Sequence, residues 1–311
     1  MSENGLIGRP VEDVIEAIVD REDDCDPKAV REALDPVTDD GVVTREAVET
    51  AVSDTSKVVA TAETRVELAG IAYEDATAAA AAVDDFEIVA ARLDAYADRL
   101  EAVEARAADL TDDLRTPVDR LDDPSAVYEL ATELREVATT AQGVVRTADD
   151  LSTDLEQFES WLAEPDRRYD EFEADVDIVD ESLDDLTAAA TALSTDSDAP
   201  AADWADATMR ARVLELLVAD LRAELAALRS WADREDAQFR ASLDDRVADA
   251  ERRTRELNDT LADHAEPAWR DRFDDALGAF DAELDGFEPP VDWNRVQETL
   301  EERREQSLPD R

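Results

Sequence analysis

Histidine, cysteine, lysine and glycine are all scarce in this sequence of 311 residues. His264 and Cys25 are the only residues of their types, and the only lysines are Lys28 and Lys57. A single cysteine excludes an intrachain disulfide and fits a reducing compartment, so we expect a cytoplasmic location. The sequence contains no glycine-rich phosphate loop, zinc-ligand spacing or nucleophile elbow. We therefore expect no enzymatic activity, no cofactor and no metal site.

Long apolar runs are missing as well. The longest, at residues 78–83, ends at Asp84, and the N-terminal sequence MSENGLIGRP has no basic region followed by an apolar one. We therefore expect neither a signal peptide nor a membrane span.

Positive charge is in short supply, because 83 acidic residues face 32 basic ones and the formal net charge is -51. Such an excess opposes a compact state by self-repulsion unless counterions screen it, and the Debye length falls to about 3 Å near 1 M salt. We interpret the composition as that of a halophilic protein with salt cations at its acidic surface. Intrinsic disorder is the alternative, because high charge with few aromatic residues is also its signature.

What the sequence has in abundance is heptad periodicity, which argues against disorder. Apolar residues follow one another at alternating steps of three and four between Val127 and Leu193. This spacing places them on one seam of a helix that needs a partner helix to cover it. Pro165 interrupts the seam, but the heptad phase agrees on its two sides. We therefore favour one kinked helix over a hairpin at this proline.

Similar seams before and after this one predict an all-α fold, an elongated antiparallel three-helix bundle of the coiled-coil type. The three long helices are expected at about 44–116, 125–193 and 203–264. The first contains a phase shift near Phe86, which is expected to overwind the coil without ending it. Turn-forming residues predict the connections at 117–124 and 194–203, with Asp203 capping the third helix.

The predicted division is a small helical head at residues 1–50, the long bundle at 51–265, and aromatic-rich C-terminal helices with a charged tail at 266–311. Pro10, Asp26-Pro27 and Thr44 are expected to begin three helices of the head. The turn between the last two resembles a calcium-binding loop, but Pro36 and Ala47 occupy two essential ligand positions, so we expect no calcium site. We also expect no binding of nucleic acid, because the third helix offers one arginine and the molecular field repels phosphate.

An aromatic stripe follows Pro267, and it is the one candidate site. Such a stripe is either a docking face for a partner protein or intramolecular core, and the core is the more common outcome. Its members are Trp269, Phe273, Leu277, Phe280, Leu284 and Phe287. Nearby, Arg252, Arg253 and Arg255 are flanked by Glu251 and Glu256, a pattern typical of surface ion pairs.

Two stretches resemble the haloarchaeal proteins loosely labelled halo transducer protein. They are GLIGRPVEDVIEAIVDRED at residues 5–23 and DPVTDDGVVTREAVETAVSDTSKVVATAETRVELA at residues 35–69. The resemblance implies a role beside methyl-accepting chemotaxis transducers. Those proteins signal through a glutamate-rich hairpin tip and carry membrane spans, and this sequence shows neither.

The leading functional hypothesis is a non-enzymatic scaffold, spacer or adaptor that acts through contacts with an unknown protein partner. One alternative is a soluble signalling component that passes a helix shift from the head to the aromatic end. Another is a regulator that touches DNA through the head. Heptads specify burial without naming the partner helix, so a homo-oligomer stays open.

Overall fold

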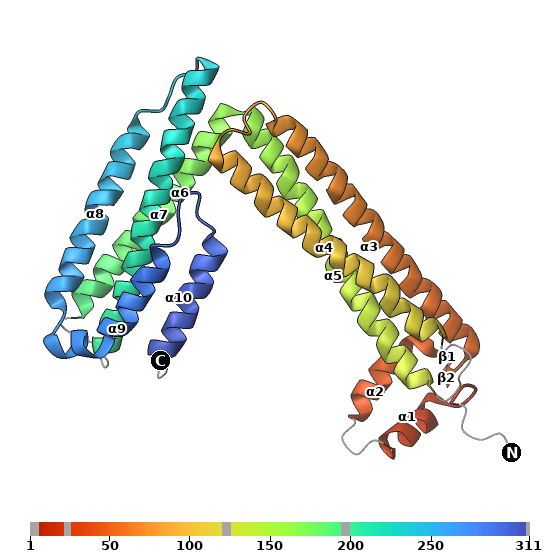
Figure 1. Cartoon of the computed structure of the whole chain (residues 1–311). Coiled ribbons are helices and arrows are strands. Elements are labelled where there is room, and N and C mark those ends of the chain that lie inside the picture. Colours follow the sequence, from red (N-terminus) through yellow and green to blue (C-terminus); the bar gives the residue numbers. More distant parts are fainter. Residues whose placement is uncertain (1–5, 22–25, 120–125, 194–199, 309–311) are drawn as a thin grey trace. The chain divides into compact units, whose positions relative to one another are not determined.

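The computed structural model describes residues 6–21, 26–119, 126–193 and 200–308, with side chains for all of them except 116–119. Within these residues the regular secondary structure is helical apart from one short hairpin, so the predicted all-α class is confirmed (Figure 1). No described helix combines the length and the apolar character needed to cross a membrane. The chain divides into two compact units that differ from the predicted division. Unit 1 comprises Met1–Ala82 and Arg92–Glu159, and unit 2 comprises Val83–Ala91 and Ser160–Arg311.

The helices of the head begin at the predicted positions to within one residue, since Pro10 is the N-cap of the first helix and not its first residue. The elements of the head are α1 (Val11–Val19), α2 (Pro27–Leu34), the short 3-10 helix η1 (Asp35–Val37), β1 (Thr38–Asp39) and β2 (Val42–Val43). The Asp26 carboxylate accepts from the Lys28 backbone N–H at 3.0 Å, which caps α2. Thr44 Oγ1 accepts from the Ala47 N–H at 3.1 Å and caps the helix that follows.

A two-stranded hairpin in the head was not predicted from the sequence. Its turn places Asp40 and Gly41 at φ values of 46° and 79°, the left-handed region that glycine adopts without strain. The hairpin also binds the N-terminal segment, because the Gly8 N–H donates to Val43 O at 2.7 Å and the Val43 N–H donates to Arg9 O at 3.0 Å. Strands of two residues are too short to show an alternating pattern of apolar residues, so the periodicity did not predict them.

Three long helices build the rest of unit 1: α3 (Arg45–Ala80), most of α4 (Glu87–Asp119) and most of α5 (Val127–Ala163) (Figure 1). Polar contacts tie all three together. The ion pair Arg65–Asp149 joins α3 to α5 at 3.4 Å, and Arg99–Asp154 joins α4 to α5 at 2.8 Å. The first residues of α5 close the core of the head. The buried members of that head core include Val14, Ile18, Val30, Leu34, Val48, Val127, Leu130 and Leu134.

The prediction of one helix over 44–116 was wrong, because α3 ends at Ala80 and α4 begins at Glu87. Two turn hydrogen bonds mark the reversal: the Ala81 N–H donates to Ala78 O at 3.4 Å, and the Phe86 N–H donates to Val83 O at 3.1 Å. The phase shift at Phe86 therefore marks a chain reversal and not an overwound coil. Neither proline nor glycine lies in this turn, so the usual signal of a helix end is missing.

The kinked continuous helix through Pro165 was also wrong. Helix α5 ends at Ala163 and α6 (Pro165–Ala192) begins at the proline itself. Glu164 between them is extended, with φ -114° and ψ 104°. A residue that precedes proline is pushed out of the helical region by the pyrrolidine ring, and proline is well suited to the first position of a new helix.

The third predicted helix is interrupted too, between α7 (Pro200–Glu235) and α8 (Ser242–His264). Asp236 adopts φ 52°, and the Ala237 N–H donates to Ala232 O at 2.9 Å, which is the bonding of a left-handed helix end with aspartate in the usual glycine position. Because α7 begins at Pro200, Asp203 lies in its first turn and is not its cap. The predicted connections at 117–124 and 194–203 are too long, because α4 continues through Pro117 to Asp119 and α7 begins at Pro200. Their remaining parts, 120–124 and 194–199, lie outside the described residues.

Helices α6, α7 and α8 surround one core in unit 2, and α9 (Pro267–Leu284) and α10 (Trp293–Ser307) cover α7. Ion pairs give the directions. Arg246 and Arg253 of α8 meet successively later residues of α6, so these two helices run parallel. Arg222 and Arg229 of α7 meet successively earlier residues of α8, so this pair runs antiparallel.

We predict that Leu183→Ala, at a fully buried position of α6, lowers the free energy of unfolding of unit 2 by about 2–5 kcal/mol, because it leaves a cavity in the core. The control is Ile178→Ala on the same helix, where the side chain is 57% exposed and the expected change is within about 0.5 kcal/mol. Urea unfolding at constant potassium chloride measures both. Equal losses would contradict the described core.

Candidate functional site

The structure places the predicted aromatic stripe inside unit 2, where its first five residues lie on α9 and Phe287 follows the end of that helix. Phe273, Phe280 and Leu284 are buried. Trp269, Leu277 and Phe287 are half-buried. This arrangement agrees with the interpretation of the stripe as intramolecular core. The stripe nevertheless divides between two clusters, which its periodicity did not indicate.

Phe273 belongs to the large core that α6, α7 and α8 share, and Trp269 packs against that core. The Trp269 ring lies 6.2 Å from the ring of Trp204, whose own Nε1–H donates to Leu261 O at 2.9 Å. Farther along α9, Phe280 and Leu284 enter a second cluster with Met209 of α7 and Val296 of α10. Helix α10 therefore covers the second cluster.

One carboxylate of α7 holds the start of α10. Trp293 Nε1–H donates to Asp220 Oδ2 at 2.9 Å, and the Val291 backbone N–H donates to Asp220 Oδ1 at 3.2 Å. Asp292 caps α10 by accepting from two backbone N–H groups at its start. Burial raises the pKa of Asp220 above its ordinary value, although the bonds from Trp293 and Val291 oppose the rise.

Two adjacent arginines hold the far end of α10. Arg303 makes a forked contact with Glu283 of α9, in which Nε donates to Oε2 at 3.0 Å and Nη2 donates to Oε1. Arg304 Nε lies 2.7 Å from Oδ1 of Asp206 on α7, a carboxylate whose side chain is only 6% exposed. The face between α7 and α9 therefore combines an apolar centre with carboxylates at both ends.

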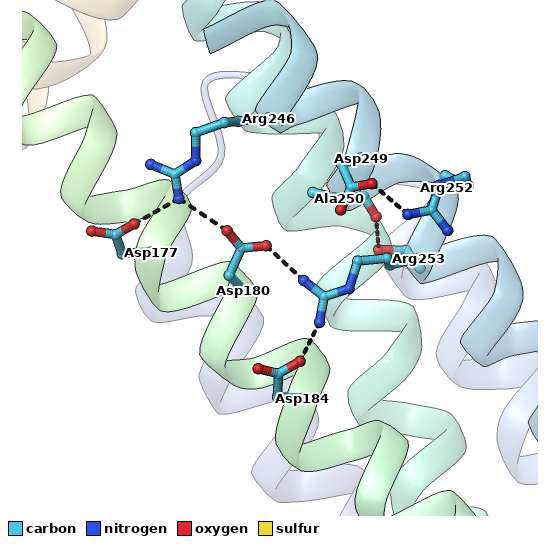
Figure 2. Close-up of polar contacts among 9 residues, drawn as sticks. Asp177, Asp180, Asp184, Arg246, Asp249, Ala250, Arg252 and Arg253 are labelled. Atoms are coloured by element: carbon cyan, nitrogen blue, oxygen red, sulfur yellow. Dashed lines mark hydrogen bonds and ion pairs between the residues drawn. The ribbon is translucent and has the colours of Figure 1, made fainter. Parts of the chain in front are cut away.

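A ladder of arginines and carboxylates joins α8 to α6 (Figure 2). Arg246 Nη2 donates to Asp177 at 2.6 Å and to Asp180 at 2.9 Å. Two turns further along α8, Arg253 Nη1 donates to the other oxygen of Asp180 at 2.8 Å, and Nη2 donates to Asp184. Each guanidinium thus lies between two carboxylates that would otherwise repel each other.

The ladder continues toward the start of α6 with a third arginine. Arg240 donates to Asp166 at 2.9 Å and to Asp170 and Glu173 at 3.0 Å each. With 32 basic residues for 83 acidic ones, one arginine that serves two or three carboxylates spreads the scarce positive charge over the seam.

The ladder corrects the interpretation of the arginine cluster in α8. Arg252 does pair within its own helix, with Asp249 and with Glu256, as a surface ion pair should. Arg253 instead reaches the neighbouring helix, and Glu251 binds Arg222 of α7 at 2.7 Å. The missed signal is a heptad of charge. The α6 acids fall at steps of four and three, at Asp166, Asp170, Glu173, Asp177, Asp180 and Asp184.

An aromatic cluster unites the α3–α4 turn with the end of α7, all within unit 2. Phe86 stacks on Trp231 with ring centroids 5.1 Å apart, and Trp161 meets Trp231 edge-on at 5.3 Å. Arg234 lies over the Phe86 ring at 4.3 Å, and its two terminal nitrogens donate to the Asp85 carboxylate at 2.7 and 2.6 Å. Both the stack and the fork therefore hold the turn in place.

A buried arginine completes this cluster at the break before Pro165. Arg168 is 3% exposed and donates through Nη1 to Leu162 O at 2.7 Å, one of the carbonyls that the end of α5 leaves without a helical partner. Its Nη2 donates to Glu235 at 2.7 Å, and its guanidinium lies 4.1 Å from the centre of the Trp231 ring. Sequence reasoning missed this site, because it treated α5 and α6 as one helix.

The residue types that could bind a metal or take part in catalysis are histidine, cysteine and the carboxylates. Across the part of the chain that the structure describes, no three histidine, cysteine, aspartate or glutamate side chains are grouped so as to hold a metal ion. His264 is the last residue of α8, while Cys25 lies outside the described residues. No family model, curated protein or solved structure matches the chain. The resemblance to halo transducer proteins stays a prediction.

We predict that Arg168→Met destabilises unit 2 by about 2–3 kcal/mol, because it removes hydrogen bonds from a charged donor. It also removes the cation beside Glu235, which keeps the hydrogen bond from Trp231 Nε1–H. Arg167→Met is the matched control, since Arg167 is the preceding residue of the same helix and is exposed. Unfolding midpoints in urea at constant salt compare the two variants. A loss of the same size in the control would contradict the role given to Arg168.

We predict a specific pH dependence for Asp220. Because its pKa is higher in the folded chain than the ordinary 3.8, the folded state holds the proton more tightly than the unfolded state does. The stability contributed by this carboxyl should therefore fall as the pH rises from about 3.8 through the raised pKa. The free energy of unfolding of the native chain minus that of Asp220→Asn, measured across this window, should decrease. Asp233→Asn, an exposed change on the same helix, supplies the background, and a rising difference would contradict the prediction.

Proposed function

We propose that the protein is a non-enzymatic helical scaffold or adaptor of a halophilic cell that acts through protein contacts. The observation that carries the proposal is the arginine–carboxylate ladder that joins α6 to α8 and to Arg240, just before α8. Its arginines are directed at neighbouring helices, where they fix how far one helix is shifted along the other. This use of polar residues serves the alignment of helices and does not converge on a reacting group.

The same ladder supports a partner of a particular kind. Because these arginines are engaged between helices, the exposed surface keeps the acidic excess that the composition imposes. Such a surface repels nucleic acids and anionic lipids, and it attracts basic or cation-bridged protein surfaces. The proposal also includes an antiparallel three-helix bundle that acts as a spacer. In this bundle the ladder sets the register of α8 against α6.

The proposal is tested with Arg246→Gln and Arg253→Gln combined, because this variant removes two rungs and keeps similar side-chain size. Amide hydrogen exchange in α6 should become faster, since the rungs resist local opening. The matched control is Arg252→Gln, whose arginine pairs only within α8 in the contacts of Figure 2. It should leave exchange in α6 unchanged.

The functional half of the test is chemical crosslinking of the tagged chain in its source cells at growth salt. A scaffold should give one recurrent partner, recovered in constant ratio with the native chain and with Arg252→Gln, and reduced with the double variant. A catalytic activity that is abolished by His264→Ala while the helical content is unchanged would overturn the proposal.

A further inference from the structure

Helix α10 buries little of its own surface within unit 2. It has 15 residues, and Val296 is the one residue of this described helix that is buried. Trp293 and Leu300 are half-buried against the same cluster. Helices of this length are marginal on their own in water, so α10 depends on the surface beneath it. It behaves as a docked segment and not as part of the main core.

The surface beneath α10 is an apolar face shared by α7 and α9. Met209 and Phe280 have no exposed area in the complete chain, and Leu284 has 7%. Val213 and Leu216 of α7 extend this face. The α7 residues fall at steps of four and three, so they form one stripe that an amphipathic helix can cover. We call this stripe together with Phe280 and Leu284 the α7–α9 face.

The charges around the α7–α9 face select which helix can cover it. Asp206 is a nearly buried carboxylate that is matched by Arg304, and Glu283 on the opposite side is matched by Arg303. A carboxylate in such a place strongly disfavours an occupant that brings no cation. The occupant therefore needs apolar anchors followed by an arginine pair.

We propose that the α7–α9 face is a binding site for an amphipathic helix of a partner protein, and that α10 is its intramolecular substitute. The partner helix carries apolar residues at i, i+3 and i+7, as Trp293, Val296 and Leu300 do, with arginines at i+10 and i+11. This inference rests on the proposed adaptor function and adds the site and the chemistry of the partner. Displacement is feasible because residues 285–292 alone connect α10 to α9.

The tether sets the conditions of the exchange. A short connection keeps α10 at an effective concentration on the order of millimolar near its site, so a free helix competes poorly with an intact α10. Weakening α10 within the full chain should therefore open the site without altering the face itself. Substitutions on α10 alone meet this requirement.

The test uses the full chain and a synthetic peptide with the sequence of residues 291–308, at a potassium chloride concentration where circular dichroism shows full helicity. Calorimetric titration should show at least tenfold tighter binding of the peptide to Val296→Asp than to the native chain. Gln297→Asp is the matched control, because it adds the same charge at the next, exposed position, and it should bind as the native chain does. A peptide with both arginines changed to glutamate should bind Val296→Asp at least tenfold more weakly.

A second variant keeps the test valid if Val296→Asp does not fold. Arg303→Glu combined with Arg304→Glu changes two half-buried side chains of α10 and leaves Val296 in place. This variant should also bind the native peptide at least tenfold more tightly than the native chain does. The proposal is overturned if neither released variant binds the peptide better than Gln297→Asp. It is also overturned if the native chain is a dimer that the peptide dissociates, since the occupant is then a second copy. Either result leaves the crosslinking test of the scaffold function unaffected.

Discussion

A guanidinium of one helix lying between two carboxylates of its neighbour is the contact that lets the acidic helices α6 and α8 lie side by side around the apolar core of unit 2. Helices with this excess of carboxylates repel each other. Arg246 and Arg253 both bind Asp180, so positive and negative charges alternate along the contact and the repulsion is offset (Figure 2). Single exposed ion pairs contribute little, about 0–1 kcal/mol each. A planar fork that reaches two carboxylates suits this task better than a lysine ammonium, which fits the near absence of lysine.

The same residue type also closes the interruptions of the long helices. Each interruption occurs without glycine, through the turn at 81–86, the extended Glu164 and the left-handed Asp236. Arg168 donates to a carbonyl at the end of α5, and Arg234 holds the turn between α3 and α4. Arginine thus provides contacts both along the helices and at their ends. A chain with few glycines and prolines can reverse direction because side chains satisfy the ends that result.

The sequence predicted which residues of the long helices are buried, but it did not predict where those helices are interrupted. Phe172 and Leu183 of the predicted seam are fully buried, because heptad positions face a core whichever helix supplies it. The prediction at Pro165 was wrong because it relied on the heptad phase. A matching phase on the two sides of the proline shows which face is buried, but it does not show whether the helix is continuous. The periodicity of the aromatic stripe could not distinguish the environment of Phe273 from that of Phe280. Asp206 and Asp220 could not have been found at all, since among 83 acidic residues nothing local marks the buried ones.

The tryptophans give the two units separate optical signatures. All five, at positions 161, 204, 231, 269 and 293, belong to unit 2, whereas unit 1 contains Tyr73, Tyr96 and Tyr128 and no tryptophan. Intrinsic indole emission therefore reports on unit 2 alone, while far-ultraviolet ellipticity sums the helices of both units. Coincidence of the two signals during unfolding would show that the units melt as one cooperative body, and separation would show that each has its own stability. The chain therefore carries a natural label for asking how far its two halves depend on each other.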